Sequence, residues 1–86
     1  MQEKVLIVLY TKPGCGLCDE MKNEMKSAGV ENLYTLEEVD IEKDAELFAR
    51  YRYDIPVLLI DGVEAFRHRL NAEDFRKYLT SRLQTN

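Results

Sequence analysis

The chain has 86 residues, a length that allows one domain and is too short for two. Apolar residues make up 45% of the sequence and charged residues 33%, proportions typical of a globular protein rather than a disordered one. The net charge of −4 argues against a general nucleic-acid-binding protein, and no apolar run approaches the roughly 20 residues of a membrane-spanning helix.

The first half of the chain has a strand, loop, helix and strand pattern. Lys4–Tyr10 is a continuous apolar, β-branched run, which predicts a central strand buried on both faces. Thr11–Gly14 is a loop marked by proline and glycine, and Cys15–Ala28 has apolar residues at helical spacing. We expect Gly29 to end that helix. Leu33–Val39 is predicted as a second strand, whose two adjacent glutamates indicate an edge position.

The second half predicts another helix, a hairpin and a final helix. Asp44–Tyr51 has a helical apolar side, and Pro56 ends that region. Val57–Ile60 and Val63–Phe66 are predicted to pair as an antiparallel hairpin, because a two-residue Asp-Gly turn joins them. Asn71 is a suitable N-cap for the last helix.

These elements predict a single α/β domain over residues 1–86 with the order β-α-β-α-β-β-α. The first two strands are expected to be parallel, because a right-handed helical crossover joins them. The final hairpin adds antiparallel strands, so we expect a mixed four-stranded sheet flanked by helices.

Cys15 and Cys18 are the candidate reactive residues. The N-terminus lacks a signal-peptide pattern, so we expect a cytoplasmic protein, and in that reducing compartment a close cysteine pair is more often catalytic or metal-binding than structural. At a helix start, positions i and i+3 are close enough for a disulfide, and the free N–H groups favour the thiolate of the first cysteine. Lys12 adds a positive charge nearby. We therefore predict that Cys15 attacks a substrate disulfide and that Cys18 resolves the mixed disulfide.

Other interpretations of the pair stay open at this point. A structural zinc site normally needs four ligands, and the chain offers two cysteines and His68. The interpretation as a purely structural disulfide is weak, because closing so short a loop restricts the unfolded chain little and therefore adds little stability. The cysteines could also be inert core residues, but the strand–loop–helix setting favours exchange chemistry. The Ile55–Pro56 bond is compatible with either the cis or the trans form.

The motifs along the chain resemble those of the glutaredoxin-like branch of the thioredoxin superfamily. The matching stretches are Leu9–Cys18, Val39–Ile41, Tyr53–Leu58 and Asp61–Gly62. The resemblance implies a thioredoxin-like fold in which Cys15 is the nucleophile and Cys18 the resolving thiol. It implies that Pro56 is cis and faces the pair, that the Val57 backbone pairs with substrate, and that Lys12 approaches both the nucleophilic sulfur and a glutathione carboxylate. The residues assigned to substrate or glutathione binding are Lys12, Gly16, Leu17, Ile55, Pro56 and Val57.

The sequence departs from that family pattern in two places. Gly16 and Leu17 stand between the cysteines, where dithiol glutaredoxins usually carry Pro-Tyr. The Gly-Gly-acidic motif that holds the γ-glutamyl end of glutathione is replaced by Phe66–Asn71. We hypothesise that Arg67 and Arg69 supply the missing contacts.

Gly16 is also similar to the second residue of the Cys-Gly-Phe-Ser motif of monothiol glutaredoxins, which hold an iron–sulfur cluster between two subunits. A non-enzymatic cluster-binding or partner-binding module is therefore the alternative function. We favour a monomeric enzyme that binds no metal and no organic cofactor, and that acts on a disulfide-containing protein or small molecule. We expect its electrons to come from glutathione or a thioredoxin-type reductase, and we expect it to bind neither nucleic acid nor membrane.

Overall fold

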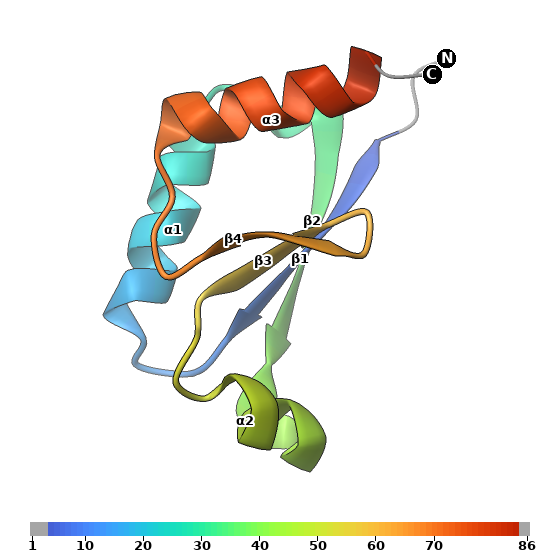
Figure 1. Cartoon of the computed structure of the whole chain (residues 1–86). Coiled ribbons are helices and arrows are strands. Elements are labelled where there is room, and N and C mark those ends of the chain that lie inside the picture. The colour runs from blue at the N-terminus through green and yellow to red at the C-terminus, as the bar shows by residue number, and fades with distance from the viewer. Residues whose placement is uncertain (1–3, 85–86) are drawn as a thin grey trace.

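The computed structural model describes residues 4–84, in which the strands and helices follow the predicted order (Figure 1). Their bounds are β1 Val5–Thr11, α1 Gly16–Ser27, β2 Tyr34–Asp40, α2 Ala45–Tyr51, β3 Val57–Ile60, β4 Val63–Arg67 and α3 Ala72–Gln84. Short 3-10 helices precede and follow β2, at Glu31–Leu33 and Ile41–Lys43. No helix within residues 4–84 is long and apolar enough to cross a membrane.

The four strands form one mixed sheet in the order β2-β1-β3-β4. β1 and β2 are parallel, whereas β3 is antiparallel to both β1 and β4. β2 is an edge strand, as its glutamates predict. The turn between β3 and β4 uses Asp61 and Gly62, whose φ values of 54° and 79° are both positive. A two-residue hairpin with positive φ at both positions matches the strand twist, which explains why Asp-Gly occurs there.

The main hydrophobic core lies between one face of the sheet and the helices α1 and α3. Ile7 and Leu9 of β1 belong to one buried cluster with Met21 of α1 and Phe75 of α3, and all of them are at most 1% exposed. Phe75 also makes an edge-to-face contact with Tyr34, with ring centroids 5.6 Å apart. The apolar stripes of the two helices therefore fix both helices against the sheet.

The prediction that β1 is buried on both faces is wrong. Ile7 and Leu9 are fully buried, but Leu6 on the opposite face is 47% exposed. α2 lies near the end of β1 (Figure 1), and its Tyr51 contacts Tyr10, which alternates onto the same face of the strand as Leu6. A seven-residue helix is about 10 Å long, whereas a seven-residue strand spans about 23 Å. The helix is therefore too short to cover the strand.

Two caps anchor the start of α3. Asn71 caps the helix as predicted, because its Oδ1 accepts hydrogen bonds from the N–H groups of Glu73 and Asp74 at 2.8 and 3.2 Å. A second acceptor comes from α1, where Glu24 Oε1 accepts a hydrogen bond from the N–H of Ala72 at 3.0 Å. This bond ties the two helices together beside the loop that precedes α3.

Candidate active site

Cys15 and Cys18 form a disulfide at the start of α1, with their Cα atoms 5.3 Å apart. Cys15 is the N-cap of the helix and has an extended backbone, with φ −88° and ψ 103°. Its Sγ accepts a hydrogen bond from the N–H of Cys18 at 3.1 Å. An N-cap normally places a side-chain oxygen in this position, so a sulfur here takes one of the unpaired donors of the helix start.

The two sulfurs differ in their exposure. Cys18 is 1% exposed and packs with Ile41 and Ile55 in a second, smaller hydrophobic cluster. Cys15 is only partly buried at the rim of that cluster. The remaining partly buried members are Tyr10, Leu47, Phe48 and Tyr51. A substrate can therefore reach the sulfur of Cys15, while that of Cys18 faces the interior.

The Ile55–Pro56 peptide bond is cis. Ile55 is 8% exposed and belongs to the cluster around Cys18, so the residue that precedes Pro56 packs against the cysteine pair. The carbonyl of Pro56 accepts the N–H of His68 at 2.8 Å. Val57 lies deeper, in β3 between β1 and β4, and has no exposed surface.

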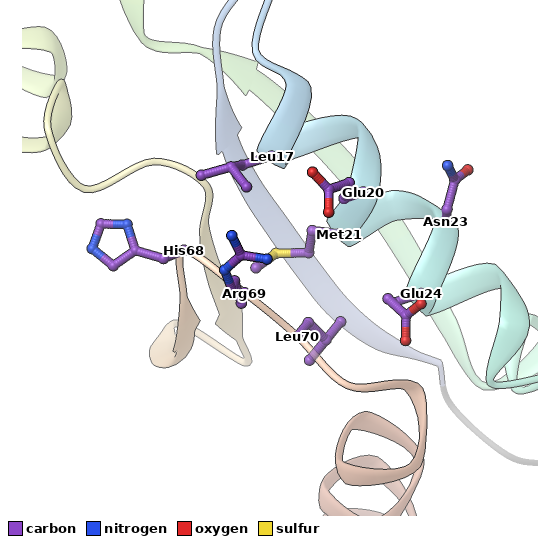
Figure 2. Close-up of a pocket in the computed structure, with 8 residues that line it drawn as sticks. All are labelled: Leu17, Glu20, Met21, Asn23, Glu24, His68, Arg69 and Leu70. Carbon is purple, nitrogen blue, oxygen red and sulfur yellow. The ribbon is translucent and has the colours of Figure 1, made fainter.

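The other predicted binding residues lie on two sides of Cys15. Lys12 and Cys15 border a groove of about 330 Å³, together with acidic residues that include Asp40. Leu17 faces a separate cavity of about 370 Å³ between α1 and the loop before α3 (Figure 2). Gly16 is exposed, and a Cβ there would meet no atom within 4 Å. The backbone of Gly16 is therefore open to an incoming molecule.

The cavity beside Leu17 carries charges of both signs. Glu20 and Glu24 border it from α1, and His68 and Arg69 border it from the opposite loop (Figure 2). Its floor includes the buried side chains of Met21 and Leu70, and Asn23 completes the lining. Such a site suits a small polar group that carries both an amine and a carboxylate.

Arg67 does not reach that cavity as hypothesised. Its guanidinium makes a bidentate pair with Glu64, with two contacts of 2.8 Å, and a further contact of 3.2 Å with Asp54. The hydrogen bond from Arg67 lowers the pKa of Glu64 below its usual value. This arginine therefore fixes the loop before Ile55 to β4, and only Arg69 borders the cavity.

Sequence reasoning missed two contacts that hold the site. Glu24 caps α3 across the cavity, a contact 48 residues apart in sequence that leaves no local signal. His68 has an exposed side chain, but its backbone N–H donates to the carbonyl of Pro56 and its φ is 69°. A non-glycine residue with positive φ is uncommon, and nothing in the local sequence predicts one at this position. Within residues 4–84 no group of three His, Cys, Asp or Glu side chains is arranged to hold a metal.

Comparisons with known proteins identify the family of this chain. Residues 6–80 match the family model described as Glutaredoxin-like domain (DUF836). A curated relative, the "Glutaredoxin-like protein YDR286C homolog" of Dictyostelium discoideum, is 34% identical over 77 residues, which cover 83% of this chain and 71% of the relative.

Solved structures extend the comparison to the fold. Protein Ne2328 of Nitrosomonas europaea has a TM-score of 0.75 at 25% identity and covers 91% of this chain and 94% of its own. Protein XcR50 of X. campestris has a TM-score of 0.74 at 25% identity, and the match covers 87% of this chain and 96% of XcR50. A thioredoxin from Halobacterium salinarum shares the fold, with a TM-score of 0.69 at 13% identity. The match covers 98% of this chain and 79% of the thioredoxin. The chain therefore belongs to the glutaredoxin-like family and has a thioredoxin-like fold.

Proposed function

We propose that this protein is a thiol–disulfide oxidoreductase with Cys15 as nucleophile and Cys18 as resolving thiol. The observation that carries the proposal is the asymmetry of the pair: Cys15 caps α1 at the accessible rim, while Cys18 is 1% exposed. A helix start favours a thiolate over a thiol, because unpaired N–H groups and the helix dipole stabilise negative charge. The accessible sulfur is thus also the one that the helix activates. Membership in the glutaredoxin-like family supports the same reaction.

The exchange proceeds in two balanced steps. The Cys15 thiolate attacks one sulfur of a substrate disulfide, forms a mixed disulfide and releases the other sulfur as a thiolate. Cys18 then loses its proton and attacks Sγ of Cys15, which releases the second substrate thiolate and leaves the Cys15–Cys18 disulfide. The substrate gains two electrons and the protein loses two. Two glutathione thiols or the dithiol of a thioredoxin-type reductase return them.

The surroundings of Cys15 suit this cycle. Lys12 shares its groove and contributes positive charge beside the attacking sulfur. The cavity with Arg69, next to Leu17, is our candidate site for the polar end of glutathione. We propose that the protein works as a cytoplasmic monomer without a bound cofactor, on protein or small-molecule disulfides.

Single cysteine variants test the proposal. Cys15→Ser should reduce the rate on a model disulfide to background, while Cys18→Ser should keep partial monothiol activity with glutathione. A Cys15→Ser protein as fast as wild type would overturn the mechanism. Reduction of the wild-type disulfide by glutathione, compared with a thioredoxin reductase system, identifies the electron source. A brown, dimeric sample after anaerobic purification would favour the iron–sulfur alternative instead.

A further inference from the structure

Cations and aromatic rings alternate where α2 ends. The sequence there is Arg50-Tyr51-Arg52-Tyr53. The guanidinium carbon of Arg52 lies 4.7 Å from the ring centroid of Tyr53 and 5.6 Å from that of Phe48, and Arg50 lies 5.4 Å from the ring of Tyr51. Contacts at these distances are cation–π interactions. We name Arg50, Arg52 and Tyr53 the basic–aromatic edge.

The basic–aromatic edge begins at the reactive site. The guanidinium of Arg52 lies over the ring of Phe48, and Phe48 packs against the cluster that contains Cys18 and Ile55. Tyr53 comes two residues before Ile55 in sequence. The basic–aromatic edge therefore adjoins, through Phe48, the cluster that surrounds the disulfide, and we infer that a polypeptide bonded to the sulfur of Cys15 extends over it.

The side chains of this edge face solvent. Tyr53 is 79% exposed, and both arginines are exposed as well. Among residues 4–84, neither Arg50 nor Arg52 belongs to an ion pair, unlike Arg67. A guanidinium stacked on a ring keeps its N–H edge available for a carboxylate. Exposed tyrosine and arginine together are the residue types enriched at protein interfaces.

The charge of the edge selects one kind of partner. The whole chain carries −4, yet this surface presents two arginines that form no ion pair within residues 4–84, although the charge of Arg50 acts on Glu64 of β4. We propose that the basic–aromatic edge recognises the polypeptide part of a protein disulfide and favours cystines flanked by acidic and apolar side chains. Carboxylates pair with Arg50 and Arg52, and an apolar side chain covers the ring of Tyr53. This inference rests on the exchange proposed for Cys15 and leaves its chemical steps unchanged.

The experiment compares kcat/KM for three disulfides. Two are cystine peptides of one sequence, with aspartate or lysine beside the cysteines, and the third is bis(2-hydroxyethyl) disulfide. We expect wild type to prefer the acidic peptide by about 5-fold, the size of one exposed charge or cation–π contact. Arg52→Glu should remove or reverse that preference, and Tyr53→Ala should slow both peptides by about 5-fold. Both variants should keep the wild-type rate on the small disulfide, and Arg76→Glu on α3 is the charge-matched control.

Each other outcome is informative. An unchanged acidic-to-basic ratio in Arg52→Glu, or an equal loss on the small disulfide, would overturn recognition by this edge. If wild type reduces none of the three disulfides, the exchange proposal fails, and recognition is then measured separately. In that case serine analogues of the two peptides are titrated while the backbone amide NMR signals of residues 50–55 are followed. Shifts there that saturate earlier with the acidic peptide support the edge, and equal or absent shifts overturn it.

Discussion

The backbone N–H of Cys18 donates a hydrogen bond to Sγ of Cys15 over 3.1 Å. The donor belongs to the first turn of α1, where N–H groups have no intrahelical acceptor. Once the disulfide is reduced, the same donor is available to a thiolate, for which a hydrogen bond from N–H is stronger than for a neutral thiol. The helix start therefore acts on Cys15 and leaves Cys18 in the apolar cluster.

We accordingly predict unequal alkylation of the reduced protein. At neutral pH, iodoacetamide should modify Cys15 at least about 10-fold faster than Cys18, because only Cys15 combines access with thiolate stabilisation. The two rates are measured by quenching at intervals and mapping the modified peptides by mass spectrometry. Cys18→Ser serves as control and should keep the fast rate at Cys15. Equal rates at the two cysteines would contradict the assigned roles.

The capping contact between the helices gives a prediction on stability. Glu24→Ala removes the acceptor of the Ala72 N–H and should lower the free energy of unfolding by about 1 kcal/mol, the usual cost of a lost helix N-cap. Glu20→Ala is the matched control, since it makes the same change one turn earlier on an exposed position of α1. Urea denaturation of the oxidised proteins measures both. A loss of the same size in Glu20→Ala would assign the effect to helix propensity or charge instead.

Contacts between neighbours in sequence were predictable, whereas contacts across the fold were not. The Asn71 cap and the Asp61–Gly62 turn depend on residues within three positions, so residue type alone identified both. The bond between Glu24 and Ala72 spans 48 positions and depends on how α1 packs against α3. The residues near Glu24 and Ala72 in sequence do not determine how α1 packs against α3, so this bond could not be predicted from them.

The exposure of Leu6 and the isomer of the Ile55–Pro56 bond also depend on packing across the fold, and for the bond only the family resemblance indicated the cis form. Leu6 belongs to an apolar run that predicts full burial, but its exposure depends on how far α2 reaches over the sheet. The cis form of the Ile55–Pro56 bond differs from trans by only about 0.5–1 kcal/mol in an isolated chain, so nearby residues do not select it. The proximity of Cys15 and Cys18 at the start of a helix was predictable, because their three-residue spacing brings the two side chains together there.

Tyr34 should make stability fall at alkaline pH. It is 8% exposed, and burial is the main cause that raises its pKa above the usual 10.0, with the charge of Glu31 second. The folded chain thus keeps this proton to a higher pH than the unfolded chain. Above pH 10.0 the unfolded state binds fewer protons, so the free energy of unfolding decreases as pH rises.

Tyr34→Phe isolates this contribution, because it keeps the ring against Phe75 and removes only the ionisable hydroxyl. From about pH 9 to about pH 11, the wild type should lose stability more steeply than the variant in urea denaturation. Lys22 also loses its ion-pair contribution in this range, because the hydrogen bond with Glu38 raises its pKa, but that change is common to both proteins. Parallel pH profiles would show that Tyr34 ionises equally well in both states.

The cavity beside Leu17 provides a test of glutathione binding. Arg69 borders this cavity opposite Glu20 and Glu24, and glutathione carries two carboxylates and one ammonium group. Reversing the charge with Arg69→Glu should raise the KM for glutathione about 5-fold, as expected when one charge-assisted contact of about 1 kcal/mol is lost. The rate of Cys15 alkylation should stay unchanged, because the substitution leaves the helix start intact. Arg76→Glu makes the same charge change on α3. An equal rise in KM in that variant would show that the net charge of the protein, and not a contact in the cavity, causes the effect. An unchanged KM in Arg69→Glu would place the glutathione site elsewhere, with the groove that contains Lys12 as the remaining candidate.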